Sequence, residues 1–423
     1  MQGRTLVAGP NGPKRIDELR AGDRVWSRGN DGQLAEQKIV SARRSVDQGL
    51  YRLRLRGRNV NAAANHRFLR VKPVHHKTTG GPCATDGCHR PARGRGLCGP
   101  CYERHRRHGT LPDAYPQVSG YEIDWVGVDQ LRRDDLVVVL DEAADAGVDA
   151  PCIPDGTLLG KEVTEELAWL LGAIVGDGTV TFKSGHPSGI RVAAFGDFAN
   201  RTTAAFAAVW DLRSVIHPTA GLIVSSARVA RVLDALGLWR RGEDKRVPEV
   251  VWGWSRRLRL QFCAGYAAAD GSFGRDGQAY HSCSRRLIDE VRQIHMEAGH
   301  RVTNVRTIRR NKPIIIRGKQ VKNPLPLHSF VVSSMEREPY TKLARAHSVS
   351  IARAFTGGSF GLRVVLGIDS LGAEPTYSLN MTGDHNFIAD GVVVYDSSLV
   401  GEVYGWASID AHIDSWGSGF RPE

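Results

Sequence analysis

Two short runs of small and apolar residues, each ending in Asp-Gly, restrict the fold of this chain more than any other feature. They read LLGAIVGDG at 170–178 and CAGYAAADG at 263–271. Glycine and alanine on one helix face leave no bulky side chain in the way, so two such helices can pack with their backbones nearly touching. The runs predict a helix pair that holds Asp177 and Asp270 side by side, where two carboxylates can bind a divalent cation. One run alone would fit a buried helix that stops at Asp-Gly; two runs favour the pair.

The sequence around each run follows a similar pattern between about 158 and 350. Apolar residues at helical spacing predict helices at 164–175, 198–211, 258–269 and 284–299. Extended segments are predicted at 179–195, 278–283, 301–318 and 328–334. The pattern indicates an α+β domain made of two similar halves.

The runs and the repeated halves resemble the LAGLIDADG homing endonucleases, with both copies of the motif in one chain. The resemblance implies pseudo-symmetric αββαββ halves whose sheets form a saddle over the DNA major groove. It implies that Asp177 and Asp270 hold Mg²⁺ for hydrolysis of both DNA strands. It also implies that DKRVPEVVW at 244–252 brings Lys245 close to the metal. From spacing alone, Lys245 could equally be a surface lysine before a turn proline.

Basic residues are expected on the DNA-facing positions of these strands. Seven cations occur in one extended segment: Arg301, Arg306, Arg309, Arg310, Lys312, Arg317 and Lys319. The first half offers Lys183, His186 and Arg191. Such a charge run is often only a solvated surface, but its density favours contact with phosphates.

Composition agrees with a nucleic-acid partner and an intracellular location. A chain of 423 residues is expected to form two or three domains, and its net charge of +12 favours a polyanion. Its longest apolar stretch, 167–176, is far too short to span a membrane, and no secretory signal opens the sequence. A soluble, cytoplasmic monomer that binds double-stranded DNA, with no membrane partner, is therefore predicted.

The two ends of the chain have the alternation of short strands and turns. Segments 5–27 and 122–140 pair short amphipathic steps with β-branched strands, and 377–397 reads as strand, turn, strand, turn, strand. Asp390-Gly391 in the last segment is a strong hairpin signal. All-β segments at opposite ends are expected to pair into one domain that is interrupted by what lies between them.

These ends resemble the Hint fold of an intein, the self-splicing domain that commonly houses this endonuclease type. The resemblance rests on GRTLV near the start, NAAANHRFL at 61–69 and GDHNFIADGVVVYDS near 396. It implies that His66 activates the first peptide bond, that His385 assists at the other end, and that Ser397 is the downstream nucleophile. Alone, His66 and His385 would fit a hydrogen bond to a loop carbonyl and a turn cap.

Several residues depart from the intein pattern. No Cys or Ser stands at the start, and counting back from Thr5 places the nucleophile one residue before Met1. Ala63 replaces the usual Thr, and Tyr395 replaces the penultimate histidine. Asp396 replaces the terminal Asn, and a carboxylate lacks the amide nitrogen that cyclises. As written, the chain is not expected to perform the first acyl shift, whereas slow cleavage at Asp396 is conceivable.

A third motif, CATDGCHRPARGRGLCGPC at 83–101, has the spacing of a zinc site. Cys83, Cys88, Cys98 and Cys101 form Cys-x4-Cys and Cys-x2-Cys pairs that suit a closed tetrahedral Zn²⁺ site. His89 or His105 could replace one cysteine, and disulfides are the weaker alternative. Around the motif lie Tyr102 and the arginines Arg90, Arg93, Arg95, Arg104, Arg106 and Arg107. They favour an accessory DNA clamp, with a structural staple as the second choice.

Together these patterns predict a multidomain chain: an all-β Hint domain from both ends, with an inserted α+β endonuclease domain and a small zinc finger. The expected boundaries are 1–75, 119–145 and 355–396 for the Hint parts, 76–118 for the zinc finger, 158–350 for the endonuclease and 397–423 for a downstream host fragment. The predicted function is site-specific cutting of double-stranded DNA. The alternatives are a splicing-competent intein whose first residue is missing from the sequence, and a DNA-binding protein without cleavage.

Overall fold

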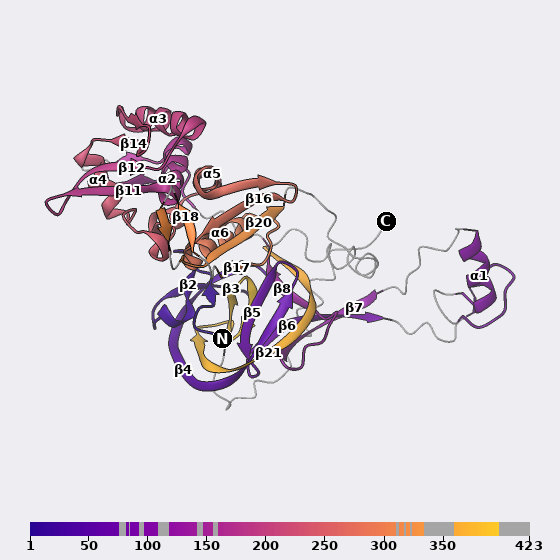
Figure 1. Ribbon diagram of the computed structural model, residues 1–423. Helices are drawn as coiled ribbons and strands as arrows, with labels where there is room; N and C mark the ends of the chain where they lie inside the picture. Colours follow the sequence, from indigo (N-terminus) through magenta and orange to yellow (C-terminus); the bar gives the residue numbers. More distant parts are fainter. Residues whose placement is uncertain are drawn as a thin grey trace.

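The computed structural model describes residues 1–75, 82–83, 85–92, 97–108, 118–141, 147–154, 160–309, 313–316, 319–321, 324–333 and 359–396. Within these residues the chain forms an all-β unit, an α+β unit and a small cysteine-bearing segment (Figure 1). The limits of the domains given above stay predictions.

Strands from both ends of the chain share one antiparallel sheet. Nine strands follow the order β2-β1-β22-β23-β6-β8-β21-β4-β3, while β5 pairs with β4 and β7 with β6. The strands are β1 (Leu6–Val7), β2 (Lys14–Arg15), β3 (Arg24–Arg28), β4 (Leu34–Leu55), β5 (Arg58–Ala63), β6 (Arg67–His75), β7 (Val118–Gly127), β8 (Leu136–Leu140), β21 (Phe360–Met381), β22 (Asn386–Ala389) and β23 (Val392–Tyr395). Because β1 pairs with β22 and β23 with β6, the two ends are neighbours, as their strand patterns predict.

The buried side chains of this sheet also come from both ends. Val7, Phe68, Val365 and Phe387 belong to one hydrophobic cluster. The predicted hairpin between β22 and β23 is confirmed, since Asp390 and Gly391 have φ values of 47° and 76°. Two successive residues in the left-handed region are what a tight hairpin turn with matching twist requires.

The α+β unit contains two halves, and in each a helix and two strands are followed by a second helix and two further strands of the same sheet. The first half has α2 (Glu165–Asp177), β11 (Gly178–Lys183), β12 (His186–Val192), α3 (Gly196–Trp210), β13 (Val215–His217), β14 (Gly221–Val224) and α4 (Ala227–Ala235). The second has α5 (Arg256–Asp270), β15 (Gly271–Gly274), β16 (Gly277–Ser282), α6 (Arg285–Glu297), β17 (Arg306–Ile308), the small pair β18 (Ile314–Ile316) and β19 (Lys319–Val321), and β20 (Leu327–Ser333). The sheets run β11-β12-β14-β13 and β15-β16-β20-β17, so the strand order is the same in both halves.

The four predicted helices of this unit are confirmed as α2, α3, α5 and α6. Thr164 and Ser284 cap α2 and α6 by accepting hydrogen bonds from the backbone nitrogens of Leu167 and Leu287. The sequence interpretation assigned no element to 212–243, where the structure has β13, β14 and α4. Between α4 and α5 lie two short 3-10 turns, η2 (Gly242–Asp244) and η3 (Glu249–Gly253).

The all-β and α+β units touch through a polar junction. The 3-10 turn η1 (Ile16–Glu18) of the all-β unit reaches α6, where Glu18 pairs with Arg286 at 3.1 Å. Arg292 on the same helix donates a hydrogen bond to the carbonyl of Gly57. Trp252 of the α+β unit packs against Gly12 so closely that any side chain at that glycine would collide with the indole ring.

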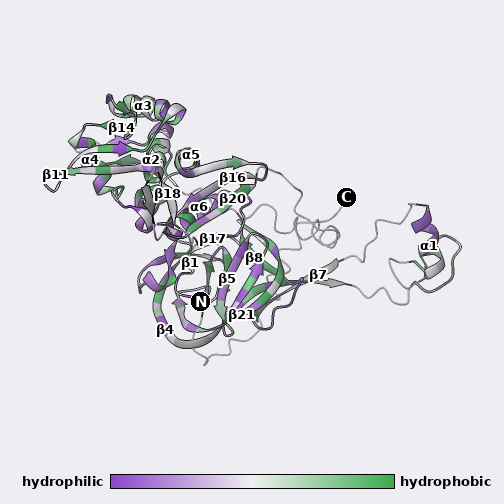
Figure 2. Ribbon diagram, viewed as in Figure 1, coloured by the Kyte–Doolittle hydropathy of each residue, from purple (hydrophilic) through white to green (hydrophobic). Residues whose placement is uncertain are grey.

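The remaining elements are few. A strand pair, β9 (Cys152–Ile153) and β10 (Lys161–Glu162), precedes α2. The helix α1 (Gly99–Arg107) follows Cys98 and stands beyond the end of the β6–β7 ribbon (Figure 1), with hydrophilic residues along it (Figure 2). In the part of the chain that the structure describes, no helix is long and apolar enough to cross a membrane.

Candidate functional site

The helices α2 and α5 pack backbone against backbone, as the two small-residue runs predict. A Cβ added to Gly172 would lie 1.9 Å from the carbonyl oxygen of Phe262, and one added to Gly265 would lie 1.8 Å from that of Trp169. No other residue type fits at either glycine without moving the partner helix. This contact fixes the ends of the two helices relative to each other.

Asp177 and Asp270 are the last residues of α2 and α5, and both are half-buried. The pKa of Asp270 is raised to about 6, first because burial disfavours its charged form and also because the negative charge of Asp177 opposes it. The positive charge of Lys245 acts in the opposite direction. The two acids therefore interact electrostatically, as their placement at the ends of a helix pair predicts.

Lys245 lies beside this acid pair. Its Nζ donates a hydrogen bond to the carbonyl of Gly176 and lies 4.0 Å from Oδ2 of Asp270. Only 18% of its side chain is exposed, so it is not the surface lysine that its spacing equally allowed. The structure thus brings together the three residues that the endonuclease resemblance names for cleavage.

The donor set at the acid pair suits magnesium. Mg²⁺ in proteins is held by one or two carboxylates, keeps several waters and takes substrate phosphate oxygens as further ligands. Asp177 and Asp270 would supply the two carboxylates. A cation between them would offset the repulsion and burial that raise the pKa of Asp270.

The start of the chain lies in the core of the all-β unit against His66. The amino nitrogen of Met1 is 2.9 Å from Nε2 of His66 and donates to the carbonyl of Tyr377 at 2.8 Å. Burial lowers the pKa of this amino group to about 4 and, together with the charge of Met1, lowers the pKa of His66 to about 3. Counting from Thr5 placed the reacting residue before Met1; in the structure Met1 itself occupies the place beside His66.

At the other end Asp396 is buried and paired with His385. Its Oδ2 accepts the backbone N–H of Met381 at 3.0 Å and lies 3.1 Å from Nδ1 of His385. His385 adopts a φ of 51°, and such left-handed backbone is uncommon for a residue with a side chain. Ser397 lies outside the described residues.

The two chain-end clusters lie close in the sheet. Val394, two residues before Asp396, pairs with Phe68, two residues after His66, in antiparallel register. Sequence reasoning did not identify Tyr377 and Met381 as partners in these clusters. Both act through main-chain atoms, which leave no residue signature.

The four cysteines of the third motif converge on one point. Their sulfur atoms all lie within 4.8 Å of one another, and among the described residues this is the cluster of three or more possible ligands close enough to hold a metal. The backbone N–H of Cys98 donates to the Cys83 sulfur and lowers the pKa of that thiol to about 6, which favours the thiolate that metals bind. The cysteines of the described residues are all free thiols rather than disulfides.

The predicted DNA-facing cations are exposed where the structure describes their side chains. These are Lys183, His186, Arg191, Arg301, Arg306 and Arg309 in the α+β unit, and Arg90, Arg104, Arg106 and Arg107 around the cysteines. Arg93, Arg95, Arg310, Lys312, Arg317 and the side chain of Lys319 lie outside the described residues.

Comparison with known proteins gives only distant similarity. No protein-family model matches the chain. An iron–sulfur cluster assembly SufBD family protein of Mycobacterium leprae is 21% identical over 91% of the chain, which spans 43% of that relative's length.

Solved structures that are similar to this chain include inteins. A variant of the Ssp DnaB mini-intein covers 95% of this chain and 96% of its own, with a TM-score of 0.30 and 8% identity. A point mutant of that variant covers 94% and 97%, with a TM-score of 0.29 and 9% identity. A DnaB intein from Synechocystis sp. PCC 6803 covers 33% and 66%, with a TM-score of 0.19 and 17% identity.

Proposed function

We propose that this chain is an intein whose Hint-type β unit carries a site-specific, magnesium-dependent DNA endonuclease. The observation that carries the nuclease is the glycine contact of α2 with α5, which brings Asp177, Asp270 and Lys245 together. Packing alone does not favour two half-buried acids at such a contact, because burial and mutual repulsion both penalise their charges. A cation bound between the two acids would offset both penalties.

The two acids and Lys245 would have different roles in phosphodiester hydrolysis. Mg²⁺, when bound, would activate a water molecule and stabilise the leaving oxygen. Asp177 and Asp270 would hold it, one acid from each half, so that each DNA strand meets one of them. Lys245, oriented by the Gly176 carbonyl, would offset negative charge on the attacked phosphate.

The open faces of the two sheets would contact the DNA. In the first sheet Thr179, Arg191 and Ile223 are cross-strand neighbours, and in the second His281, Ser329 and Arg306 are. The opposite faces are buried against the helices through residues such as Ile190 and Phe330. Alternation along each strand thus separates a core face from an open face whose polar and basic side chains can reach a groove.

The test is cleavage of a plasmid that carries the gene encoding this chain with codons 1–396 deleted. We expect the full chain to linearise it at one position with Mg²⁺ and to leave it intact with EDTA. Specific binding without cutting would contradict the nuclease and leave a DNA-binding protein.

The Hint part of the proposal is supported by the placement of both chain ends. Met1 lies against His66, Asp396 pairs with His385, and the strand that ends before Asp396 pairs with the strand that begins after His66. The buried Asp396 occupies the position where an asparagine amide would attack its own main-chain carbonyl. Its carboxylate has no such nitrogen, so Asp396 cannot release Ser397 by forming a succinimide.

Replacing Asp396 by asparagine is therefore expected to release the fragment 397–423. The new amide nitrogen attacks the residue-396 carbonyl, a succinimide forms, and the proton passes to the departing Ser397 amine. Mass spectrometry of the purified chain over a day at neutral pH would detect the fragment. Asp396→Gln, which is one methylene longer, should release none, and the Asp396→Asn, His385→Ala double variant should release less. An intact Asp396→Asn chain would contradict the Hint assignment.

The four-cysteine cluster would hold a structural Zn²⁺ and present α1 to DNA phosphates. Exposed Arg104, Arg106 and Arg107 in the last turn of α1 give this helix its positive charge. Cys98→Ser is expected to remove the metal, because tetrahedral thiolate sites need all four ligands. Zinc measured by elemental mass spectrometry should fall from about one ion per chain to a small fraction, while Cys152→Ser, an exposed cysteine outside the cluster, should retain it. Equal zinc in both variants would exclude this site.

A further inference from the structure

The segment that carries Lys245 is attached to α6 at two points. The hydroxyl of Ser284, which caps α6, donates to the carbonyl of Lys245 at 2.5 Å. Two residues further along, the backbone N–H of Val247 donates to Oε2 of Glu290 at 2.7 Å. Ser284 and Glu290 are both buried, with 0% and 3% of their surface exposed. The main chain from Lys245 to Val247 is therefore held by the first two turns of one helix.

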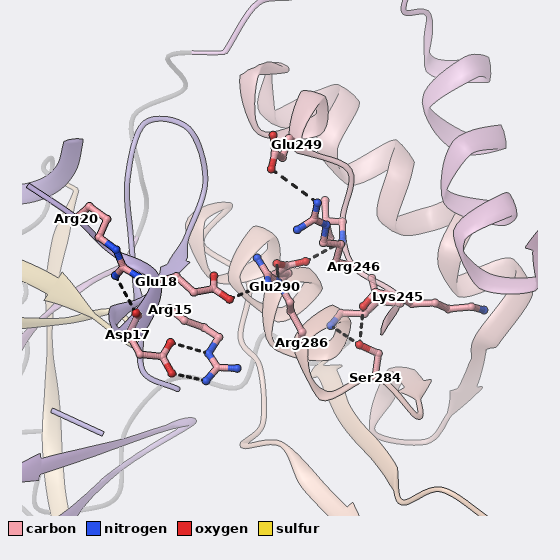
Figure 3. A network of polar contacts seen from close by, with 12 residues as sticks. Arg15, Asp17, Glu18, Arg20, Lys245, Arg246, Glu249, Ser284, Arg286 and Glu290 are labelled. Atoms are coloured by element: carbon pink, nitrogen blue, oxygen red, sulfur yellow. Dashed lines mark hydrogen bonds and ion pairs between the residues drawn. The ribbon is translucent and has the colours of Figure 1, made fainter. Parts of the chain in front are cut away.

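Glu290 also connects this segment to the all-β unit. Its second oxygen, Oε1, accepts from Nε of Arg286 at 2.8 Å. Nη1 of Arg286 in turn donates to Oε1 of Glu18 on η1 at 3.1 Å. Figure 3 shows this series, with Glu18 on one side, Arg286 and Glu290 in the middle, and Lys245 with Ser284 on the other. One buried carboxylate thus bridges the Lys245 segment and the junction between the units.

We propose that Glu290 is a positioning residue that holds Lys245 against the acid pair, and that Glu18 of the all-β unit supports it through Arg286. The role of Lys245 in cleavage rests on the proposed function, whereas the contacts that hold its segment do not depend on it. Because Lys245 Nζ must reach both the Gly176 carbonyl and the neighbourhood of Asp270, a small shift of its backbone removes it from the site.

The chain contains a matched control on the same helix. Glu297 is likewise a buried acid of α6, but it pairs with Arg259 at 2.8 Å and with Gln293 at 3.0 Å. Removing its charge should loosen α6 to a similar extent without releasing the Lys245 segment. A comparison of substitutions at Glu290 and Glu297 therefore separates an effect on the position of Lys245 from an effect on the stability of α6.

The first experiment measures the accessibility of Lys245 without metal or DNA. The full chain is acetylated with a limiting reagent, and modification of Lys245 is followed by mass spectrometry relative to the exposed Lys183. We expect Glu290→Gln to raise the rate at Lys245 about fivefold, and Glu18→Lys about twofold because an exposed ion pair contributes little. Glu297→Gln should match the wild type. An unchanged rate in Glu290→Gln, or an equal rise in Glu297→Gln, would overturn the positioning role, and an unchanged rate in Glu18→Lys would overturn the link to the all-β unit.

The second experiment measures single-turnover cleavage of the plasmid described above. Glu290→Gln is expected to slow cutting about tenfold, because glutamine keeps one acceptor oxygen whereas Val247 and Arg286 donate to two. In a Lys245→Met background it should have no further effect, because the two residues act through the same group. A tenfold loss in both backgrounds, or normal cutting by Lys245→Met alone, would overturn the inference. If the wild type does not cut at all, the nuclease proposal fails, while the acetylation result still decides the role of Glu290.

Discussion

Replacing Asp177 or Asp270 by asparagine is expected to slow DNA cleavage more than about 1,000-fold while specific DNA binding persists. Either change leaves a neutral amide where a carboxylate would hold Mg²⁺, so only one of the two proposed carboxylate ligands would remain. Single-turnover cleavage and a binding assay with EDTA present would separate chemistry from binding. Asp197→Asn, an exposed acid at the start of α3, should cut like the wild type.

The substitution Asp270→Asn is also expected to raise the stability of the metal-free chain at pH 7. Because the pKa of Asp270 is raised to about 6 in the folded chain, its ionised form is disfavoured by folding. Without metal, this group should make the fold more stable as the pH falls from 7 through about 6, toward the ordinary aspartate pKa. Asp270→Asn should remove this dependence and raise the melting temperature at pH 7. Normal cutting by the variant would contradict the role of Asp270 in cleavage. A melting temperature below that of the wild type at pH 7 would contradict a folded state in which the ionised form of Asp270 is disfavoured.

Replacing Gly172 or Gly265 by alanine is expected to destabilise the α+β unit by more than about 3 kcal/mol. Helix propensity alone predicts the opposite sign, since alanine is favoured over glycine by about 1 kcal/mol in a helix interior. The added Cβ would lie less than 2 Å from a carbonyl oxygen of the partner helix, and a backbone atom cannot rotate away as a side chain can. Urea unfolding of the full chain would measure the loss, and cleavage should disappear with it.

Gly253→Ala is the matched control for these variants. A Cβ at Gly253 would meet nothing within 4 Å, and its φ lies outside the left-handed region, so its stability should stay close to that of the wild type. If Gly172→Ala were as stable as Gly253→Ala, the backbone contact between α2 and α5 would be wrong. The acid pair at the end of that contact would then lose its physical basis.

The parts of the fold that could be predicted are those whose packing demands particular residue types. The α2–α5 contact requires glycine at Gly172 and Gly265, and the hairpin at Asp390-Gly391 requires left-handed backbone, so both leave a signature in the sequence. The cysteine cluster is predictable for the same reason. Strands β13 and β14 are only three and four residues long, which is too short for a periodic pattern to stand out.

The contacts that complete the candidate sites were less accessible to prediction. Lys245 is oriented by the carbonyl of Gly176 and its segment by the amide of Val247, and every residue has such groups. The partner of Met1 at Tyr377 is likewise a main-chain carbonyl. Residue type therefore indicated which side chains matter, and only the fold shows what holds them in place.

The equal strand order of the two halves has a consequence for the shape of any target. Thr179 and Ser272 occupy corresponding positions, each two residues after the acid that ends its helix. Across the sheet, however, Thr179 faces Arg191 whereas Ser272 faces Ala279. A duplex lying over both halves would meet a guanidinium on one side and a methyl group on the other. Within one covalent chain each half can change alone, so a target contacted by both halves would have no need to be a palindrome.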